Sequence, residues 1–175
     1  MSFEFDTYIV LDMPSPVNEI ITNLRKHHND EFRSSLPVEI TVAGSSGNGV
    51  IEKGQDEEFV YNTIKQIALR TKPIKTSFKD VLRFPGTDIF VLTLRDEDAF
   101  MKLYEKINKS GIKFKHSEFP YKPHCTLRSK SPISDDEIKA IMETKIDLEF
   151  ILDTISIYTM DKIPMSKIFT NKLLG

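Results

Sequence analysis

The chain has 175 residues, of which 39% are hydrophobic and 29% charged, and its formal net charge is −2. These values predict one domain of 1–175, or two lobes packed closely within it, with ample length for a sizeable core. The slightly acidic balance argues against a dedicated binder of long nucleic acids, which normally carries a basic surplus.

The single cysteine, Cys125, cannot form an internal disulfide, which suits a reducing cytoplasm. No apolar run is long enough to span a membrane, and residues 1–6 lack the basic and apolar regions of a secretion signal. We therefore expect a cytoplasmic monomer with no membrane partner. Within its strand, Cys125 is predicted to be a small buried hydrophobe rather than a catalytic thiol.

The first half of the chain is predicted to alternate between strands and helices. Ser15 is a good N-cap for a helix that starts at Pro16. His27 and His28 lie at the end of this helix, and we interpret them as solvated residues because no cysteine or paired acid lies at metal-ligand spacing. Apolar periodicity and turn residues give strand 5–11, helix 16–28, strand 38–43, helix 56–70 and strand 74–84.

The second half repeats this order. Ser134 and Glu137 form a capping box that opens a helix, and His116 is interpreted as a surface residue. The expected elements are strand 89–94, helix 96–111, edge strand 113–116, a strand at 124–127, a helix after 134, and strands 147–158 and 163–170. The two passes, 5–84 and 89–158, predict a duplicated α+β fold of two pseudo-symmetric lobes.

Residues 44–49 form a glycine-rich loop directly after the strand at 38–43. The loop lacks the Lys-Ser/Thr ending of a nucleotide-binding loop, so a simple connector is one interpretation. Since it adjoins Thr41, a loop that lines a ligand cleft is the other.

A polar pair stands out in the apolar strand that follows Pro123. Because side chains alternate along a strand, His124 and Thr126 share one face, opposite Cys125 and Leu127. An imidazole moves a proton near neutral pH, and a neighbouring hydroxyl donates a hydrogen bond to an anionic oxygen. The pair therefore predicts a site that handles phosphate.

A related pair occurs earlier, after Pro37. Glu39 and Thr41 share one face of their strand, and Ile40 and Val42 point to the other. Each half of the chain thus offers a polar residue and a threonine, and we expect both pairs to face one cleft. The first half carries a glutamate where the second carries a histidine.

These strings, the spacing between them and the order of elements resemble the 2H phosphoesterase superfamily, which contains 2′-5′ RNA ligases and RNA 2′,3′-cyclic phosphodiesterases. The resemblance covers nearly the whole chain. It implies antiparallel sheets that line a central cleft with helices outside, no metal or other cofactor, and a nucleotide or RNA end with a phosphate as partner. By resemblance, His124 and Thr126 match the second family motif, Thr41 matches the first, and Glu39 stands in place of the first histidine.

The resemblance implies an enzyme that opens or forms a cyclic phosphate or a 2′-5′ linkage. Such chemistry uses one base and one acid, a task that two imidazoles perform well near pH 7. Three interpretations of Glu39 stay open: a base beside an acidic His124, a neutral acid with a raised pKa, or the mark of an inactive protein that only binds nucleotides or RNA ends.

Two further residues are candidate ligand contacts. By alternation, Arg128 continues the face of His124 and Thr126, where it would pair with a phosphate; a surface ion pair is the alternative. Tyr121 precedes the motif and would stack on a base, unless it packs at the rim of the core instead.

Overall fold

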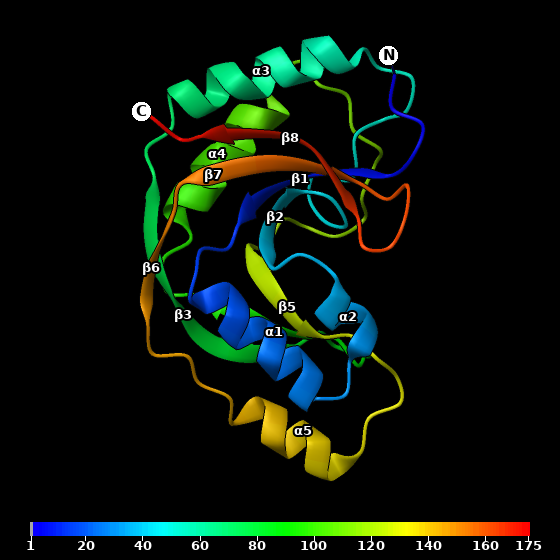
Figure 1. Ribbon diagram of the computed structural model, residues 1–175, viewed down its shortest axis with the longest axis vertical. Helices are drawn as coiled ribbons and strands as arrows, with labels where there is room; N and C mark the ends of the chain where they lie inside the picture. The colour runs from blue at the N-terminus through cyan, green and yellow to red at the C-terminus, as the bar shows by residue number, and fades with distance from the viewer. Residues whose placement is uncertain (1) are drawn as a thin grey trace.

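The computed structural model describes residues 2–175, and two antiparallel four-stranded sheets form its centre (Figure 1). The first sheet has the strand order β2-β1-β7-β8, and the second has the order β5-β4-β3-β6. The strands of the first sheet are β1 (Thr7–Asp12), β2 (Glu39–Ala43), β7 (Thr154–Thr159) and β8 (Ser166–Lys172). Those of the second are β3 (Ile74–Arg83), β4 (Phe90–Leu94), β5 (His124–Arg128) and β6 (Glu149–Leu152).

Helices lie at both ends of the molecule, outside the sheets (Figure 1). They are α1 (Val17–His27), α2 (Glu31–Ser35), α3 (Glu57–Leu69), α4 (Asp98–Asn108) and α5 (Asp135–Met142). Contacts of α3 with β8 and of α4 with β2 join two helices to the first sheet, and contacts of α1 with β5 and of α5 with β3 join two to the second. The α+β class with helices outside antiparallel sheets is thus confirmed.

The two sheets do not follow the boundary between 5–84 and 89–158. A hairpin turn carries β3 directly into β4, so β3 from the first range pairs inside the second sheet. In exchange, β7 from the second range pairs with β1 in the first sheet. Each sheet therefore combines strands of both ranges, and the contacts between the ranges are part of the sheets themselves.

The single strand expected over 147–158 is wrong, because the chain changes sheets within it. β6 pairs with β3, whereas β7 pairs with β1 and β8. Asp153 lies at the break, where its carboxylate accepts hydrogen bonds from Thr154 Oγ1 at 2.7 Å and Lys172 Nζ at 2.8 Å. A continuous β-rich run in the sequence contains no signal for a change of partner.

The first helix also differs from expectation at both ends. Ser15 does not cap the backbone, because its hydroxyl donates to Glu19 Oε1 at 2.8 Å. His28 is only 6% exposed rather than solvated, and its carbonyl accepts a hydrogen bond from Arg128 Nε at 3.0 Å. Burial, with contributions from His27 and Arg128, lowers the pKa of His28. The short helix α2, which is too short to show apolar periodicity, was not predicted.

Several local predictions are confirmed. The helix predicted over 56–70 is present as α3, and Ser134 and Glu137 form the predicted capping box of α5. Cys125 is fully buried, and burial raises the pKa of its thiol to about 11. Across residues 2–175, none of the helices has the length and apolar character needed to cross a membrane.

Candidate active site between the two motif strands

The edge strands β2 and β5 lie beside each other where the two sheets meet (Figure 1). A pocket of about 330 Å³ opens there, and Glu39, Thr41, His124 and Thr126 all line it. The structure thus brings the four predicted side chains, which lie about half the chain apart in sequence, into one cleft.

A buried arginine that the sequence analysis did not single out joins the two motif strands. Arg25 of α1 is 1% exposed, and its Nε and Nη2 donate to the Thr126 carbonyl at 3.1 and 2.8 Å. Its Nη1 donates to the carbonyls of Arg33, Leu36 and Pro37, just before β2. One guanidinium therefore fixes the position of β5 relative to the chain that leads into β2.

His124 is held in one orientation by its own strand. Its Nδ1 lies 2.6 Å from the Lys122 carbonyl, which can only accept, so we assign the hydrogen to Nδ1. The neutral ring then keeps an unprotonated Nε2. The Phe84 ring meets the imidazole edge-on at 5.3 Å. Burial, reinforced by the nearby positive charge of Arg33, lowers the pKa of His124 despite the hydrogen bond to the carbonyl.

Glu39 accepts a hydrogen bond from the threonine of its own motif. Thr41 Oγ1 donates to Glu39 Oε2 at 2.8 Å. Burial raises the pKa of Glu39, and the nearby carboxylate of Asp12 adds to this rise. The hydrogen bond from Thr41 and the positive charges of Arg25 and Arg33 only partly oppose the effect of burial.

Arg33 is a second functional candidate that the sequence analysis missed. It comes from α2, lines the same pocket, and donates from Nη2 to Ser129 Oγ at 3.1 Å. Asp30 caps α2 through Arg33 N at 2.9 Å and also accepts from Ser129 N at 2.7 Å, which ties the helix to the end of β5. No sequence signal placed this basic residue in the cleft, because its position depends on these tertiary contacts.

The remaining walls of the cleft are largely apolar. Phe32, Phe84 and Met165 provide flat or flexible apolar surface beside the polar residues. Ser45 also lines the pocket, so the glycine-rich loop contributes to the cleft. Gly47 in this loop has φ +63°, and a Cβ there would lie 2.7 Å from Tyr121 Cβ. Glycine is needed at this position on both counts.

The phosphate contact expected of Arg128 is wrong, whereas the alternative of an ion pair is present: Arg128 Nη2 lies 3.8 Å from Glu137 Oε1, although the arginine itself is buried. Thr126 pairs with Val91 and Arg128 with the adjacent Phe90, so β5 contains one extra residue, Leu127, at a β-bulge. The bulge breaks the alternation that would have placed Arg128 beside Thr126. Arg128 is instead 2% exposed, and besides its bond to the His28 carbonyl it donates to the carbonyls of the chain between β5 and α5.

Tyr121 does not line the cleft and packs behind it. Its ring stacks on Tyr104 at 4.5 Å with an interplanar angle of 8°. Its hydroxyl donates to the Thr41 carbonyl at 3.2 Å, so that it supports β2 from the rear. Of the two interpretations of this residue, packing is the one that the structure supports.

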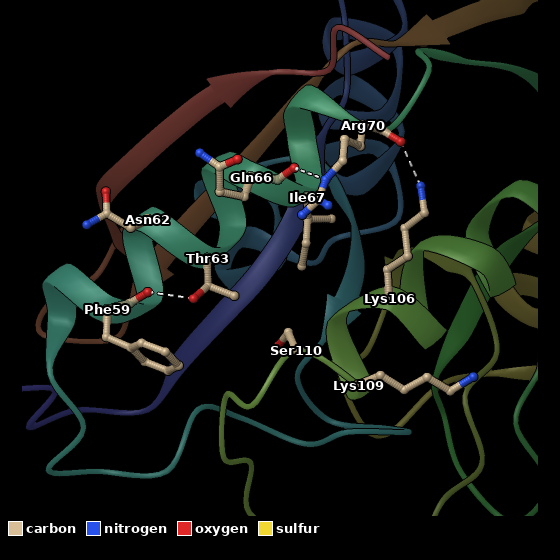
Figure 2. Close-up of a pocket in the computed structure, with 9 residues that line it drawn as sticks. All are labelled: Phe59, Asn62, Thr63, Gln66, Ile67, Arg70, Lys106, Lys109 and Ser110. Atoms are coloured by element: carbon tan, nitrogen blue, oxygen red, sulfur yellow. Dashed lines mark hydrogen bonds between the residues drawn. The ribbon is translucent and has the colours of Figure 1, made fainter.

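A larger pocket, about 790 Å³, lies between α3 and α4 (Figure 2). Neither a histidine nor a carboxylate lines it, and Figure 2 shows Lys106 reaching across to the Arg70 carbonyl, a 2.8 Å hydrogen bond. This pocket therefore lacks the imidazole and carboxyl groups of the cleft between β2 and β5, and its ionisable side chains are all basic. Within the described part of the chain, no three His, Cys, Asp or Glu side chains are grouped as metal ligands would be.

The fold is that of the 2H phosphoesterase superfamily. Residues 13–163 match the family model of the 2′-5′ RNA ligase superfamily, and the chain belongs to this family. A search of curated proteins returned no match.

Solved structures share the fold at low sequence identity. TT0787 of Thermus thermophilus is 16% identical, with a TM-score of 0.64 over 97% of this chain and 98% of its own. E. coli LigT, in a complex with 3′-AMP, is 14% identical, with a TM-score of 0.64 over 98% and 99%. Usb1 of Kluyveromyces marxianus is 9% identical, with a TM-score of 0.53 over 93% and 97%.

Proposed function

We propose that this protein is a phosphodiesterase that hydrolyses a 2′,3′-cyclic phosphate at the end of a nucleotide or RNA, with 2′-5′ linkages as a related substrate. The observation that carries the proposal is the single cleft in which Glu39, Thr41, His124 and Thr126 meet. Its acid–base pair joins a carboxyl to an imidazole, so the usual symmetry of two histidines is replaced by two different groups.

In this proposal His124 is the general base and Glu39 the general acid. Nε2 of His124 takes a proton from water, and the water oxygen forms a bond to phosphorus. The bond between phosphorus and one ribose oxygen breaks, and Glu39 protonates that oxygen. The product is a phosphomonoester with a free ribose hydroxyl, and the transferred protons balance.

The environments of the two groups support this assignment over the reverse. Burial lowers the pKa of His124, which favours the neutral ring with Nε2 as a base. Burial raises the pKa of Glu39, which favours the protonated carboxyl as an acid. Two groups whose pKa values move toward each other in this way are suited to exchange protons with one substrate near neutral pH.

Arg33 and Thr126 complete the site. The Arg33 guanidinium is the cation of the cleft that offsets a phosphate, and Thr126 donates to a non-bridging oxygen as charge develops there. The apolar wall of Phe32 and Phe84 suits the face of a nucleobase. Structures of E. coli LigT in complexes with 3′-AMP, ATP and phosphate support a ligand of this class.

A second candidate function is nucleotide or RNA-end binding without turnover. The observation that favours it is the hydrogen bond from Thr41 to Glu39, because it occupies a hydroxyl that would otherwise donate to phosphate. This protein would keep the cleft and bind the same ligands.

The test is incubation with nucleoside 2′,3′-cyclic phosphates in the presence of EDTA, with the product followed by chromatography. We expect a phosphomonoester, and a rate that falls about 100- to 10,000-fold in His124→Ala. His116→Ala, at an exposed histidine outside the cleft, is the matched control and keeps the rate. Calorimetric binding of 3′-AMP with no turnover would reject hydrolysis and support the second candidate function, binding. If neither binding nor turnover is observed, both functions are rejected.

A further inference from the structure

The face of the first sheet that carries Glu39 continues away from the cleft. Residues directly opposite each other in antiparallel strands share a face. Asp12 of β1 pairs with Glu39, and on the next two strands Tyr158 pairs with Tyr8 and Lys167 pairs with Tyr158. Since Tyr8 and Asp12 are four residues apart on one strand, all of these side chains point to the same side.

A hydrogen-bonded group is built on this face next to Glu39. The Asp12 carboxylate accepts from Lys167 Nζ at 2.8 Å, from the Tyr158 hydroxyl at 3.0 Å and from Ser156 Oγ at 2.6 Å. The Lys167 ammonium also lies 5.3 Å from the centre of the Tyr158 ring. Adjacent strands are about 4.8 Å apart, so Asp12 holds this ammonium beside the strand that carries the proposed acid.

A second pocket beside the cleft, about 320 Å³, opens over this group. It shares Leu36, Pro37 and Tyr158 with the cleft, so the two pockets adjoin across a common wall. Its polar lining includes Asn18 and Thr22 of α1 as well as the Asp12–Lys167 ion pair.

The chemistry of this second pocket differs from that of the cleft. The charges of Asp12 and Lys167 offset each other, and the side chain of Asn18 adds amide donors. Such a site suits a neutral group rich in donors and acceptors, such as a nucleoside, rather than an isolated anion. The Lys167 ammonium lines this pocket and would meet the phosphate that links that nucleoside to a group in the cleft.

We propose that the pocket over Asp12 and Lys167 holds the nucleotide that precedes the terminal one, and that the substrate is an RNA end of at least two nucleotides. The inference rests on the proposed function of the cleft and adds the length of chain that the protein recognises. The terminal cyclic phosphate lies between Glu39 and His124, and Lys167 contacts the preceding phosphate.

The test compares adenosine 2′,3′-cyclic phosphate with an adenosine dinucleotide that ends in the same cyclic phosphate. We expect kcat/KM to be at least about tenfold higher for the dinucleotide, with most of the gain in KM. In Lys167→Met this ratio falls toward one, and Lys167→Arg restores it. Lys172→Met, on the same strand but bonded to Asp153, is the control and leaves the ratio unchanged.

A variant on a different element keeps the test independent of the Asp12–Lys167 pair. Thr22→Tyr places a bulky side chain in the second pocket and is expected to remove the preference, whereas Lys26→Tyr, at an exposed position of the same helix, preserves it. Equal kcat/KM for the two substrates in the wild type, or a ratio unchanged by both Lys167→Met and Thr22→Tyr, overturns the inference. If neither substrate is hydrolysed, the proposed phosphodiesterase activity is rejected instead. The ratio of the dissociation constants of the two compounds then decides whether the protein prefers the dinucleotide.

Discussion

The two motif strands occupy equivalent positions and differ in their chemistry. β2 is the edge strand beside β1, and β5 is the edge strand beside β4. Thr41 pairs with Val10 and Thr126 with Val91, and in both strands the register shifts by one residue immediately after the threonine. The backbones of the two motif strands are thus alike, so the difference between the motifs lies in their side chains.

The hydroxyl of the second motif is free to bond a ligand in the cleft, whereas the hydroxyl of the first motif is hydrogen-bonded within the motif itself. The Lys122 carbonyl holds His124 from its Nδ1 side, and among residues 2–175 the Thr126 hydroxyl forms no hydrogen bond. In the first motif Thr41 donates to Glu39. A glutamate at this position therefore changes two groups at once, the acid–base residue and the hydroxyl two positions later.

The largest expected effect comes from breaking the link between the two strands. Arg25→Met removes five hydrogen bonds to four carbonyls and leaves buried acceptors unpaired. We expect a loss of about 3 to 5 kcal/mol in the free energy of unfolding, measured by urea denaturation. Lys26→Met, at the exposed neighbouring position, is the control. Equal losses in the two variants would show that Arg25 does not join the strands.

The next effect tests whether Glu39 works as an acid. Glu39→Gln keeps the shape and a partner for Thr41 but cannot release a proton, so kcat/KM is expected to fall about 100-fold. The decline of the rate at high pH, which reports deprotonation of Glu39, should also disappear from the pH profile. Glu58→Gln, exposed on α3, serves as the control.

The replacement Glu39→His makes the two motifs alike. It releases the Thr41 hydroxyl and restores a pair of imidazoles, so we expect a higher kcat/KM than in the wild type, measured on the same cyclic nucleotides. For the preceding prediction, a wild-type rate in Glu39→Gln would show that Glu39 is not the general acid and that His124 acts without it.

The smallest expected effect is on the free energy of unfolding, whose dependence on pH has opposite signs for Glu39 and His124. Burial raises the pKa of Glu39 above 4.5, so its contribution to stability is complete below pH 4.5 and is lost as the pH rises through the raised value. Burial lowers the pKa of His124 below 6.5, so its contribution is complete above pH 6.5 and is lost as the pH falls through the lowered value.

Urea denaturation of variants measures these two contributions. Relative to the wild type, Glu39→Gln should gain stability as the pH rises from 4.5 to 8, because the wild-type carboxyl must then ionise at a buried site and the amide need not. His124→Gln should also gain stability relative to the wild type, but as the pH falls below 6.5 rather than as it rises. Parallel changes in both variants would contradict the assignment of opposite protonation preferences to the two motifs.

The sequence by itself determined the parts of this protein that depend on local periodicity. Alternation placed Glu39 with Thr41 and His124 with Thr126, apolar spacing located α3, and a capping box located α5. Local patterns succeed here because each follows from the geometry of a single strand or helix.

Only the tertiary structure decided how these elements are combined. The exchange of β3 and β7 between sheets, the bulge that turns Arg128 away, and the placement of Arg25 and Arg33 at the cleft all depend on contacts between distant segments. The protonation of the site residues also depends on the tertiary structure, because burial shifts the pKa values of Glu39 and His124. Burial is produced by the packing of the whole chain, and no short stretch of residues specifies it.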